Sequence, residues 1–420
     1  MKENAYLCID LKSFYASVEC VERGLDPMTA NLAVADPARG KGSVCLAISP
    51  SMKALGIKNR CRVYQIPQYV EYITAPPRMK LYIKYSADIY GVYLKYIAKE
   101  DIHMYSIDEA FLDVTHYLSL YQKTARELAL DIMADIRTVT GIPAAAGVGS
   151  NLYLAKVSLD ILAKHGKDSI ACLNEEQYRD ILWDHRPLTD FWRVGDGTAK
   201  RLSRIGIRTM REIAQADEEV LYRMLGVDAE LLIDHAWGRE STTLKDIKAY
   251  TPKSSSFSSG QVLPRDYSFE ESKLIVKEMM DGLCLEMEEE DVTAKSVTLT
   301  VGYSNATGKE PDAGTVTLPQ AARAYQTLIP KVVKLYERIA RKEMPIRKIT
   351  LTCNGVTEES YGQYDLFGAY EAEEKDRKIQ RAVLEIKRKF GKNALIRGMD
   401  LLEAGTARER NHQIGGHRSG

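Results

Sequence analysis

The sequence predicts an α+β protein made of several domains, and three observations support this. The chain has 420 residues, which is too long for a single compact core. The first 165 residues alternate strand patterns with helical patterns, whereas residues 166–240 show helical patterns alone. After a polar stretch, residues 254–356 alternate strands and helices again, which indicates a second α/β unit.

The first part of the chain predicts a strand–helix–hairpin–helix–strand order, which is that of a ferredoxin-like sheet. A small segment punctuated by Gly and Pro interrupts it, with short strands at 31–36 and 42–49 and a basic helix at 51–55. The expected elements of the sheet layer are strands at 5–10, 103–107, 110–114 and 143–149, with helices at about 13–23, 80–98, 119–139 and 151–164.

The rest of the chain contains a helical part, a linker and the second α/β unit. Gly-containing turns at 194–197 and 225–227 join the short helices of residues 166–240. The polar stretch that follows, ending at 251–256, is typical of a linker. Beyond it we expect strands near 256–262, 294–303, 314–318 and 346–353, helices near 269–290 and 320–342, and one last helix at about 371–390.

Composition excludes several classes of protein. The formal net charge is zero, so any surface for nucleic acid must be a local patch. The seven cysteines are scattered without a C-x-x-C pair, which fits neither a disulfide framework nor a zinc site. The sequence has no run of about 18 apolar residues, and its first residues do not resemble a signal peptide. We therefore expect a cytoplasmic protein that does not bind membranes.

Three acids stand where strands end or bend. Asp10 ends the first strand, and Asp108 and Glu109 form the bend of the hairpin. In a ferredoxin-like sheet these strands are neighbours, so the acids can meet although they lie far apart in sequence. Carboxylates bridging two divalent cations are what two-metal phosphoryl transfer requires, and Mg²⁺ prefers such hard oxygen ligands. Without further context, however, a vicinal Asp-Glu pair is more often a solvated bend.

Two sequence motifs supply that context. Residues 10–19 are DLKSFYASVE and residues 106–111 are SIDEAF. Together they resemble the signature motifs of the Y-family DNA polymerases, D-x-[DN]-x-F-[FY]-A-x-V-E and S-I-D-E-[AC]. The resemblance extends over the whole chain and is closest to the bacterial UmuC-like branch. It implies template-directed, low-fidelity synthesis past DNA damage in an SOS-type response, and no exonuclease signature for proofreading is evident.

The resemblance also implies a right-handed polymerase with a ferredoxin-like palm, small fingers, a helical thumb and an α/β little finger. The expected bounds are 1–13 and 78–165 for the palm, 14–77 for the fingers, 166–240 for the thumb, 241–253 for a linker, 254–356 for the little finger, and 357–420 for a C-terminal tail.

By the same resemblance, Asp10, Asp108 and Glu109 are the catalytic metal ligands. They are expected to hold two Mg²⁺ ions, which Mn²⁺ can replace, with the backbone carbonyl of Leu11 as a further contact. Phe14 and Tyr15 belong to the nucleotide site, and Tyr15 occupies the position of the steric gate against a ribose 2′-hydroxyl. A core aromatic on a helix is the alternative for Tyr15.

Three further residues are expected to contact the nucleotide. Residues 47–57 resemble the finger motif A-x-S-Y-E-A-R-x-F-G-V, which places Ser49 and Lys53 in the nucleotide site. Pro50 replaces the motif's Tyr, and Lys53 replaces its Arg, giving a point charge in place of a bidentate fork. Lys156 and Lys164 match a lysine-bearing palm helix, with Lys164 as a triphosphate ligand. The family spacing between these two lysines is commonly one residue shorter.

Contacts with DNA are expected from the thumb and the little finger. Residues 189–202 fit a helix–hairpin–helix pattern, in which the backbone N–H groups at Gly195 and Gly197 can bind a DNA phosphate without reading sequence. Candidate phosphate contacts on the little finger are Lys295, Ser296, Arg347 and Lys348.

The C-terminal tail contains a candidate clamp-binding peptide. Residues 363–367 (QYDLF) resemble the Q-x-x-L-F peptide by which bacterial polymerases dock on the sliding β clamp. Gln363 would form hydrogen bonds while Leu366 and Phe367 fill an apolar pocket. Residues 408–418 resemble the tail of UmuC-like proteins from Gram-positive bacteria, without indicating a role.

The expected partners are primer–template DNA, a deoxynucleoside triphosphate (dNTP) and the clamp, in the bacterial nucleoid. The UmuC-like resemblance suggests a UmuD-like accessory protein or a recombinase filament as further partners, and the sequence leaves that need open. Two alternatives compete with a polymerase. A non-catalytic, clamp-recruited repair scaffold would lack the three carboxylates, and a nucleotide cyclase would need neither the thumb hairpin nor the clamp peptide.

Overall fold

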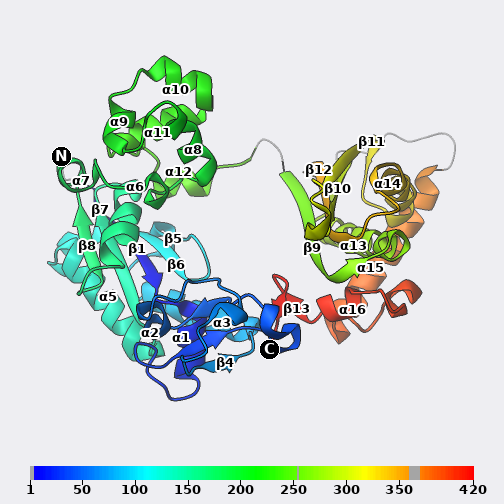
Figure 1. Cartoon of the computed structure of the whole chain (residues 1–420), viewed down its shortest axis with the longest axis horizontal. Helices are drawn as coiled ribbons and strands as arrows, with labels where there is room; N and C mark the ends of the chain where they lie inside the picture. The colour runs from blue at the N-terminus through cyan, green and yellow to red at the C-terminus, as the bar shows by residue number, and fades with distance from the viewer. Residues whose placement is uncertain (1–3, 253–254, 359–368) are drawn as a thin grey trace. The chain divides into compact units, whose positions relative to one another are not determined.

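The computed structural model describes residues 4–252, 255–358 and 369–420. The chain divides into two compact units, Met1–Tyr250 with Arg418–Gly420, and Thr251–His417. Figure 1 shows the helices and strands of each unit. In the part of the chain that is described, no helix is both long enough and apolar enough to cross a membrane.

A five-stranded sheet lies at the centre of the first unit, in the order β5-β6-β1-β7-β8. β1 pairs antiparallel with both β6 and β7, and β8 pairs parallel with β7. The four strands other than β8 have the ferredoxin-like order that the sequence predicts. The strands are β1 (Tyr6–Leu11), β5 (Ile102–Met104), β6 (Glu109–Asp113), β7 (Ala144–Gly149) and β8 (Ile170–Leu173).

The prediction that residues 166–240 are purely helical is wrong at the start of that range. Residues 170–173 form β8 and extend the five-stranded sheet at its β7 edge. Four residues are too few for periodicity to distinguish a strand from a helix, so the pairing with β7 decides the outcome. The remainder of the range is helical, as expected.

Among the helices around the sheet, α5 has the clearest start and end signals. Thr124 and Glu127 form a capping box at the start of α5, and Gly141 ends that helix at a φ of 72°. The helices of this layer are α1 (Phe14–Val21), α3 (Met79–Tyr93), α4 (Tyr117–Tyr121), α5 (Ala125–Thr140), α6 (Leu152–Val157), the π-helical segment η4 (Ser158–Ala163) and the 3₁₀ turn η3 (Lys99–Asp101).

The small residues of β7 allow α6 and η4 to lie directly against the sheet. A side chain at Gly147 would meet the carbonyl oxygen of Ala155 at 2.1 Å, and one at Gly149 would meet the backbone nitrogen of Ala155 at 2.2 Å. Neither glycine can therefore be replaced without moving this helix. The contact fixes the height of α6 and η4 above the strand that pairs with β1.

The segment between α1 and α3 forms a small three-stranded sheet with its own apolar cluster, in the order β3-β2-β4. Ile48 and Met52 are fully buried in that cluster. Its elements are β2 (Leu32–Val34), η1 (Pro37–Gly42), β3 (Ala47–Ile48), α2 (Pro50–Ala54), η2 (Val63–Gln65) and β4 (Ile73–Ala75).

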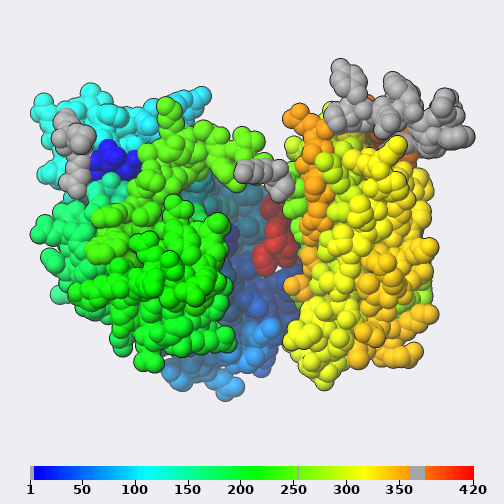
Figure 2. Space-filling model, turned by 90° about the horizontal axis from the view of Figure 1, so that it is seen from above, coloured from blue at the N-terminus to red at the C-terminus, as the bar shows by residue number. Residues whose placement is uncertain are grey.

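The helical part that follows β8 forms a separate lobe of the first unit, seen in green in Figure 1 and Figure 2. Its core gathers buried side chains such as Phe191, Leu202 and Leu221. The helices are α7 (Glu175–Leu182), η5 (Leu188–Asp190), α8 (Asp196–Arg204), α9 (Met210–Ala214), α10 (Glu218–Leu225), α11 (Asp228–Ala236) and α12 (Leu244–Ala249).

The stretch expected to be a linker contains α12, which packs on the rest of the first unit. Thr243 and Asp246 form a capping box at its start. Leu244 is 2% exposed and joins the apolar cluster beneath the sheet. The Nζ atom of Lys248 donates to the carbonyl oxygens of Lys99 at 2.6 Å and Glu100 at 2.8 Å. The first unit accordingly extends to residue 250.

The second unit contains a four-stranded antiparallel sheet, in the order β11-β10-β12-β9, with a large apolar core beside α13 and α14. Its elements are β9 (Ser255–Tyr267), α13 (Phe269–Glu289), β10 (Val292–Tyr303), η6 (Asn305–Thr307), β11 (Asp312–Ala322), α14 (Tyr325–Ile339), β12 (Ile346–Glu358), α15 (Ala369–Phe390), η7 (Gly398–Leu401), α16 (Ala407–Arg410) and β13 (Gln413–Ile414). β14 (His417–Arg418) pairs with β13 near the C-terminus.

Two expectations about the second unit need adjustment. The third strand is longer than 314–318, and the helix expected at 320–342 begins only at Tyr325, because β11 continues to Ala322 in its pairing with β10.

The tail beyond α15 is folded, since Thr406 donates through its backbone nitrogen to buried Glu278 at 2.9 Å. The clamp peptide residues Gln363, Leu366 and Phe367 lie outside the described residues.

Candidate active site

The pairing of β1 with β6 brings the expected acids together. Asp10 lies opposite Glu109, and the backbone nitrogen of Leu11 donates to the carbonyl oxygen of Asp108 at 2.9 Å. Alternation along β1 puts Asp10 on the same face as Cys8, which packs in the cluster beneath α6 and η4. The site is therefore built between the end of β1 and this helix.

Glu109 is held from two sides in a nearly closed environment. Only 7% of the Glu109 surface is exposed. Its Oε1 accepts from Lys156 Nζ at 2.6 Å and from Cys8 Sγ at 3.1 Å. Lys156 and Cys8 thus supply the polar partners that a carboxylate buried opposite Asp10 requires.

Asp10 is paired with Lys164, whose Nζ lies 3.1 Å from Asp10 Oδ2. Burial raises the pKa of Asp10 from 3.8 to about 6, against the lowering effect of Lys164. The negative charges of Asp108 and Glu109 raise it further. Three carboxylates thus repel one another here, and a cation between them would relieve that repulsion.

Asp108 is half-buried, and its Oδ1 accepts from Ser106 Oγ at 2.7 Å. Among the described residues, no three His, Cys, Asp or Glu side chains stand ready around one metal position. Asp10 and Glu109 are each paired with a lysine. The donors themselves, three carboxylates and the Leu11 carbonyl, are the hard oxygens that Mg²⁺ prefers, so the residues fit the expected ion.

The start of α1 lies next to these acids. Ser13 adopts a left-handed φ of 49° and gives α1 no side-chain cap, so the first N–H groups of the helix, beginning at Phe14, lack a capping side chain. Ser13 Oγ is buried without a hydrogen-bond partner among the described residues. Uncapped helix N-termini of this kind attract anions such as phosphate.

Tyr15 stacks on Tyr82 of α3, with ring centroids 4.6 Å apart and an angle of 20° between the rings. Tyr82 is fixed in turn, since its hydroxyl donates to the fully buried Glu19 at 2.8 Å. Arg78 makes two hydrogen bonds to the same carboxylate, at 2.9 and 2.8 Å. The expected steric gate is consequently a half-buried ring on a rigid support.

The two residues expected in the fingers differ in their placement. Ser49 is fully buried, and its Oγ accepts from the backbone nitrogens of Leu32 and Met52, so its side chain caps α2. Lys53 lies on α2 within the electrostatic field of Asp10 and Asp108. Desolvation lowers the pKa of Lys53, and these two acids act in the opposite direction. Ser49 Oγ is therefore engaged by the backbone of its own segment, and Lys53 brings positive charge near the acids.

The lysine-bearing helix changes its winding between Lys156 and Lys164. Ser158–Ala163 is π-helical, and the backbone nitrogen of Lys164 donates to the carbonyl oxygen of Leu159 at 3.0 Å, five residues back. A single extra residue in a helix is commonly absorbed as such a bulge. The one-residue difference from the family spacing is thereby accommodated, and Lys164 reaches Asp10.

Gly195 and Gly197 stand at the start of α8, Gly195 as its N-cap without a side-chain cap. A side chain placed at either glycine would meet nothing within 4 Å. Their backbone is open to an approaching group, as the phosphate-binding prediction requires. The element before the turn is the 3₁₀ helix η5, and Arg193 of the connection stacks over Trp192, with 5.0 Å between the guanidinium carbon and the ring centroid.

The four candidate phosphate contacts expected on the little finger lie on two neighbouring strands, Lys295 and Ser296 on β10 and Arg347 and Lys348 on β12. Ser296 and Lys348 alternate with the buried Val297 and Ile349, so they face the open side of the sheet. Arg347 pairs with an aspartate at 3.5 Å. A phosphate contact is thus best supported for Ser296 and Lys348.

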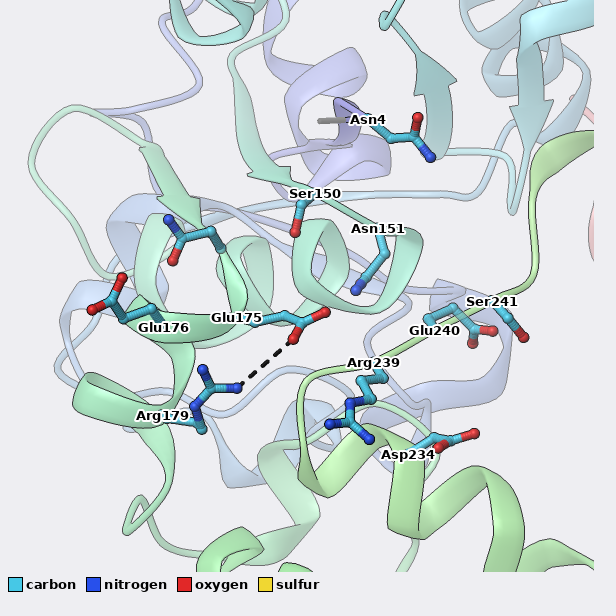
Figure 3. A pocket seen from close by; sticks show the side chains of 11 residues that line it. Asn4, Ser150, Asn151, Glu175, Glu176, Arg179, Asp234, Arg239, Glu240 and Ser241 are labelled. Atoms are coloured by element: carbon cyan, nitrogen blue, oxygen red, sulfur yellow. Dashed lines mark ion pairs between the residues drawn. The ribbon is translucent and has the colours of Figure 1, made fainter. Parts of the chain in front are cut away.

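A polar pocket of about 650 Å³ lies elsewhere on the first unit, among the side chains labelled in Figure 3. Glu175 and Arg179 of its lining form an ion pair at 3.7 Å. None of the three candidate metal ligands lines it. The chemistry expected from the sequence therefore does not lie in this pocket.

Sequence reasoning missed Asp160, Cys8 and Tyr82. Asp160 lies 2.9 Å from the Nζ atoms of both Lys156 and Lys164. Its spacing of four residues from each lysine is a recognisable signal for ion pairs on a helix. Cys8 and Tyr82 carry no such signal, because each reaches the site through pairing or packing.

Comparison with known proteins places this geometry in a family. Residues 9–160 match the model of the impB/mucB/samB family, and residues 254–366 match that of its C-terminal domain. The chain is 31% identical over 420 residues to the "Putative UV-damage repair protein UvrX" of Bacillus subtilis, covering 98% of this chain and 97% of the relative. It is 29% identical to DNA polymerase IV 2 of Bacillus subtilis over 430 residues, covering 99% of each chain.

Solved structures support the fold. A Y-family DNA polymerase chimera of Dbh and Dpo4 superposes with a TM-score of 0.66 at 19% sequence identity, covering 84% of this chain and 100% of the chimera. The likeness in fold thus covers more of the chain than the five-stranded sheet alone. The chain therefore belongs to the impB/mucB/samB family and is a Y-family, lesion-bypass DNA-directed DNA polymerase.

Proposed function

We propose that this chain extends a primer by two-metal nucleotidyl transfer, with Asp10, Asp108 and Glu109 as the ligands of two Mg²⁺ ions and Mn²⁺ as a substitute. The observation that carries the proposal is the pairing of Asp10 with Glu109 across β1 and β6, with Asp108 at the adjacent bend. Such ions, when bound, favour attack of the primer 3′-hydroxyl on the α-phosphate and neutralise charge on the triphosphate.

The remaining residues bind and orient the nucleotide. The open N-terminus of α1 at Phe14 supports binding of the triphosphate, and Lys53 and Lys164 supply positive charge beside it. The ring of Tyr15 excludes a ribose 2′-hydroxyl by its bulk. Backbone N–H groups at Gly195 and Gly197 bind the DNA backbone, and such contacts position the duplex without reading its sequence.

We further propose a role in an SOS-type damage response, at low fidelity and without proofreading. The small three-stranded fingers support this, because a small subdomain with little core encloses a nascent base pair only loosely. Gln363, Leu366 and Phe367 are proposed to dock on the β clamp. A UmuD-like accessory protein or a recombinase filament is a further proposed partner, as the UmuC-like resemblance suggests, and the nucleoid is the proposed location.

Primer extension on intact and abasic templates, with Mg²⁺ or Mn²⁺, tests the proposal. Wild type is compared with the double variant Asp108→Ala, Glu109→Ala, after both proteins are shown to melt at similar temperatures and to bind primed DNA. We expect extension past the lesion by wild type alone. Extension that survives the double substitution would disprove the assignment of the carboxylates.

The alternative of a non-catalytic repair scaffold makes the opposite prediction in the same assay. Neither protein would extend the primer, although both would bind DNA. The retained acids and their pairing favour the enzyme. Adding a recombinase filament and a UmuD-like protein to the inactive wild type separates a scaffold from a polymerase that needs a partner.

A further inference from the structure

An unbroken row of alternating charges connects two of the candidate metal ligands. Glu109 contacts Lys156 at 2.6 Å, and Lys164 contacts Asp10 at 3.1 Å. Between the two lysines stands Asp160, which uses Oδ2 for Lys156 and Oδ1 for Lys164, each at 2.9 Å. Asp160 is thus the member of the row that is neither a candidate metal ligand nor in contact with one, and it pairs with both lysines.

The π-helical segment makes this row possible. In an α-helix each residue advances by about 100°, so side chains four residues apart drift sideways by about 40° at each step. Lys164 lies two such steps beyond Lys156, so in a regular α-helix the side chains of the two lysines would not line up. The wider winding of Ser158–Ala163 turns less per residue and brings Lys164 back above Asp160. Bulges of this kind recur at functional sites.

The helix cannot shift to absorb a change in this row. Its backbone touches β7 where a side chain at Gly147 would lie 2.1 Å from the Ala155 carbonyl and 2.4 Å from the Leu159 nitrogen. The side chain of Lys156 is also 8% exposed, whereas that of Lys164 is 31% exposed. Lys156 is therefore fixed, and Lys164 is the member of the row that can move.

We propose that Asp160 is a positioning residue that shares Lys164 with Asp10, so that Lys164 can release Asp10 to a divalent cation and turn to the phosphates of the incoming nucleotide. This rests on the proposed function of the three carboxylates. Lys164 forms an ion pair with Asp10 when no cation is bound there. Lys164 and the cation therefore compete for the Asp10 carboxylate. Asp160 weakens that competition by giving the ammonium group a second carboxylate.

The test uses the full chain and two readouts that do not depend on turnover. Mn²⁺ affinity without nucleotide is measured by electron paramagnetic resonance, and dNTP affinity is measured on a dideoxy-terminated primer. Lys164→Ala should bind Mn²⁺ more tightly and dNTP more weakly, each by about tenfold or less. Asp160→Asn should weaken both, because Lys164 is then left to Asp10 alone. In steady state Asp160→Asn should raise KM for dNTP more than it lowers kcat.

A double-mutant cycle separates positioning from simple charge. If Asp160 acts through Lys164, adding Asp160→Asn to Lys164→Ala should leave Mn²⁺ affinity unchanged. An equal loss in both backgrounds would overturn the proposal. Asp168→Asn is the matched control, since its side chain is 75% exposed and pairs only loosely with Arg126 at 3.4 Å. It should alter neither affinity.

Failure of the inference and failure of the proposed function give different results. If the carboxylates are not the metal site, Asp108→Ala, Glu109→Ala retains Mn²⁺ binding and extension. If they are, but Asp160 has no positioning role, that double variant loses both while Asp160→Asn resembles Asp168→Asn. Should Asp160→Asn fail to fold, Lys164→Ala alone decides, because unchanged Mn²⁺ affinity there contradicts any competition for Asp10.

Discussion

Asp10 and Glu109 face each other across the antiparallel pairing of β1 and β6, each bonded to a different lysine of one helix. The sheet thus sets the distance between the two acids, and the helix balances their charge. Because the strand register determines both positions, a change of charge at one end of β6 should affect catalysis without altering the pairing.

Glu109→Gln tests this relationship. The amide can still accept from Cys8 and Lys156, so the sheet should remain folded, but one anionic metal ligand is lost. Loss of outer partners alone typically costs about 10–100-fold, and we expect at least that reduction in primer extension. Asp113→Asn, at the other end of β6, is the control and should retain near wild-type activity. Equal activity of both variants would contradict a ligand role for Glu109.

Tyr15→Ala should admit ribonucleotides. The ring rests on Tyr82 at a centroid distance of 4.6 Å, so it cannot yield to a 2′-hydroxyl without unstacking. Removing the ring should lower discrimination against ribonucleoside triphosphates by about tenfold or more. A change of this size is typical when a pocket gains room for one small substrate group. The measurement is kcat/KM for matched ribo- and deoxyribonucleotides. Tyr15→Phe retains the ring and should discriminate like wild type, and equal loss in both variants would exclude a steric gate.

Deleting Leu162 should be tolerated better than inserting an alanine after it. The deletion removes the residue that the π-helical winding absorbs, so an α-helical turn can return Lys164 to its place. The insertion moves Lys164 away. We expect the KM for dNTP to change by about threefold or less on deletion and by about tenfold or more on insertion. Equal losses in the two variants would show that the bulge itself matters, and thermal melting monitors the fold.

Glu240→Ala should destabilise the first unit in a pH-dependent way. Burial raises the pKa of Glu240, but hydrogen bonds from His235 and Thr242 outweigh it and bring the pKa from 4.5 to about 2. The carboxylate therefore stabilises the fold above pH 4.5, and this contribution is lost as the pH falls towards 2. Leaving the buried donors unpaired costs about 1–3 kcal/mol.

Urea unfolding of wild type and Glu240→Ala at pH 7 and pH 4 measures that loss, and the difference between them should shrink at the lower pH. Asp184→Ala removes an exposed partner of Arg211 and should change the free energy of unfolding little at either pH. A difference for Glu240→Ala that grew on acidification would contradict the sign of the pKa shift.

The sequence predicts the fold class and the ferredoxin-like order, because period-two and helical patterns are strong over long segments. It also predicts that Asp10 meets the bend at Asp108 and Glu109 across neighbouring strands, and the pairing puts Asp10 opposite Glu109, the first residue of β6. It misses β8, since four residues carry no period. Ser49 matches a motif by residue type. Its hydroxyl oxygen, however, accepts hydrogen bonds from two backbone nitrogens, and these contacts depend on how the surrounding segment folds.

The winding of the lysine helix is the clearest limit of sequence reasoning. The extra residue before Lys164 is visible in the spacing, but a count of residues does not say whether the helix will rotate the lysine away or widen to keep it. That choice depends on the contact of the helix with Gly147 and Gly149, and hence on long-range packing.

Replacing Gly197 should affect the stability of the protein and its contact with DNA in opposite directions. Gly197 lies in the first turn of α8, and neither a left-handed backbone nor a crowded neighbour requires glycine there. Alanine in a helix is more favourable than glycine by about 1 kcal/mol. Gly197→Ala should therefore raise the melting temperature while weakening contact with a DNA phosphate. At such a position screening for thermostability and screening for activity would select opposite residues.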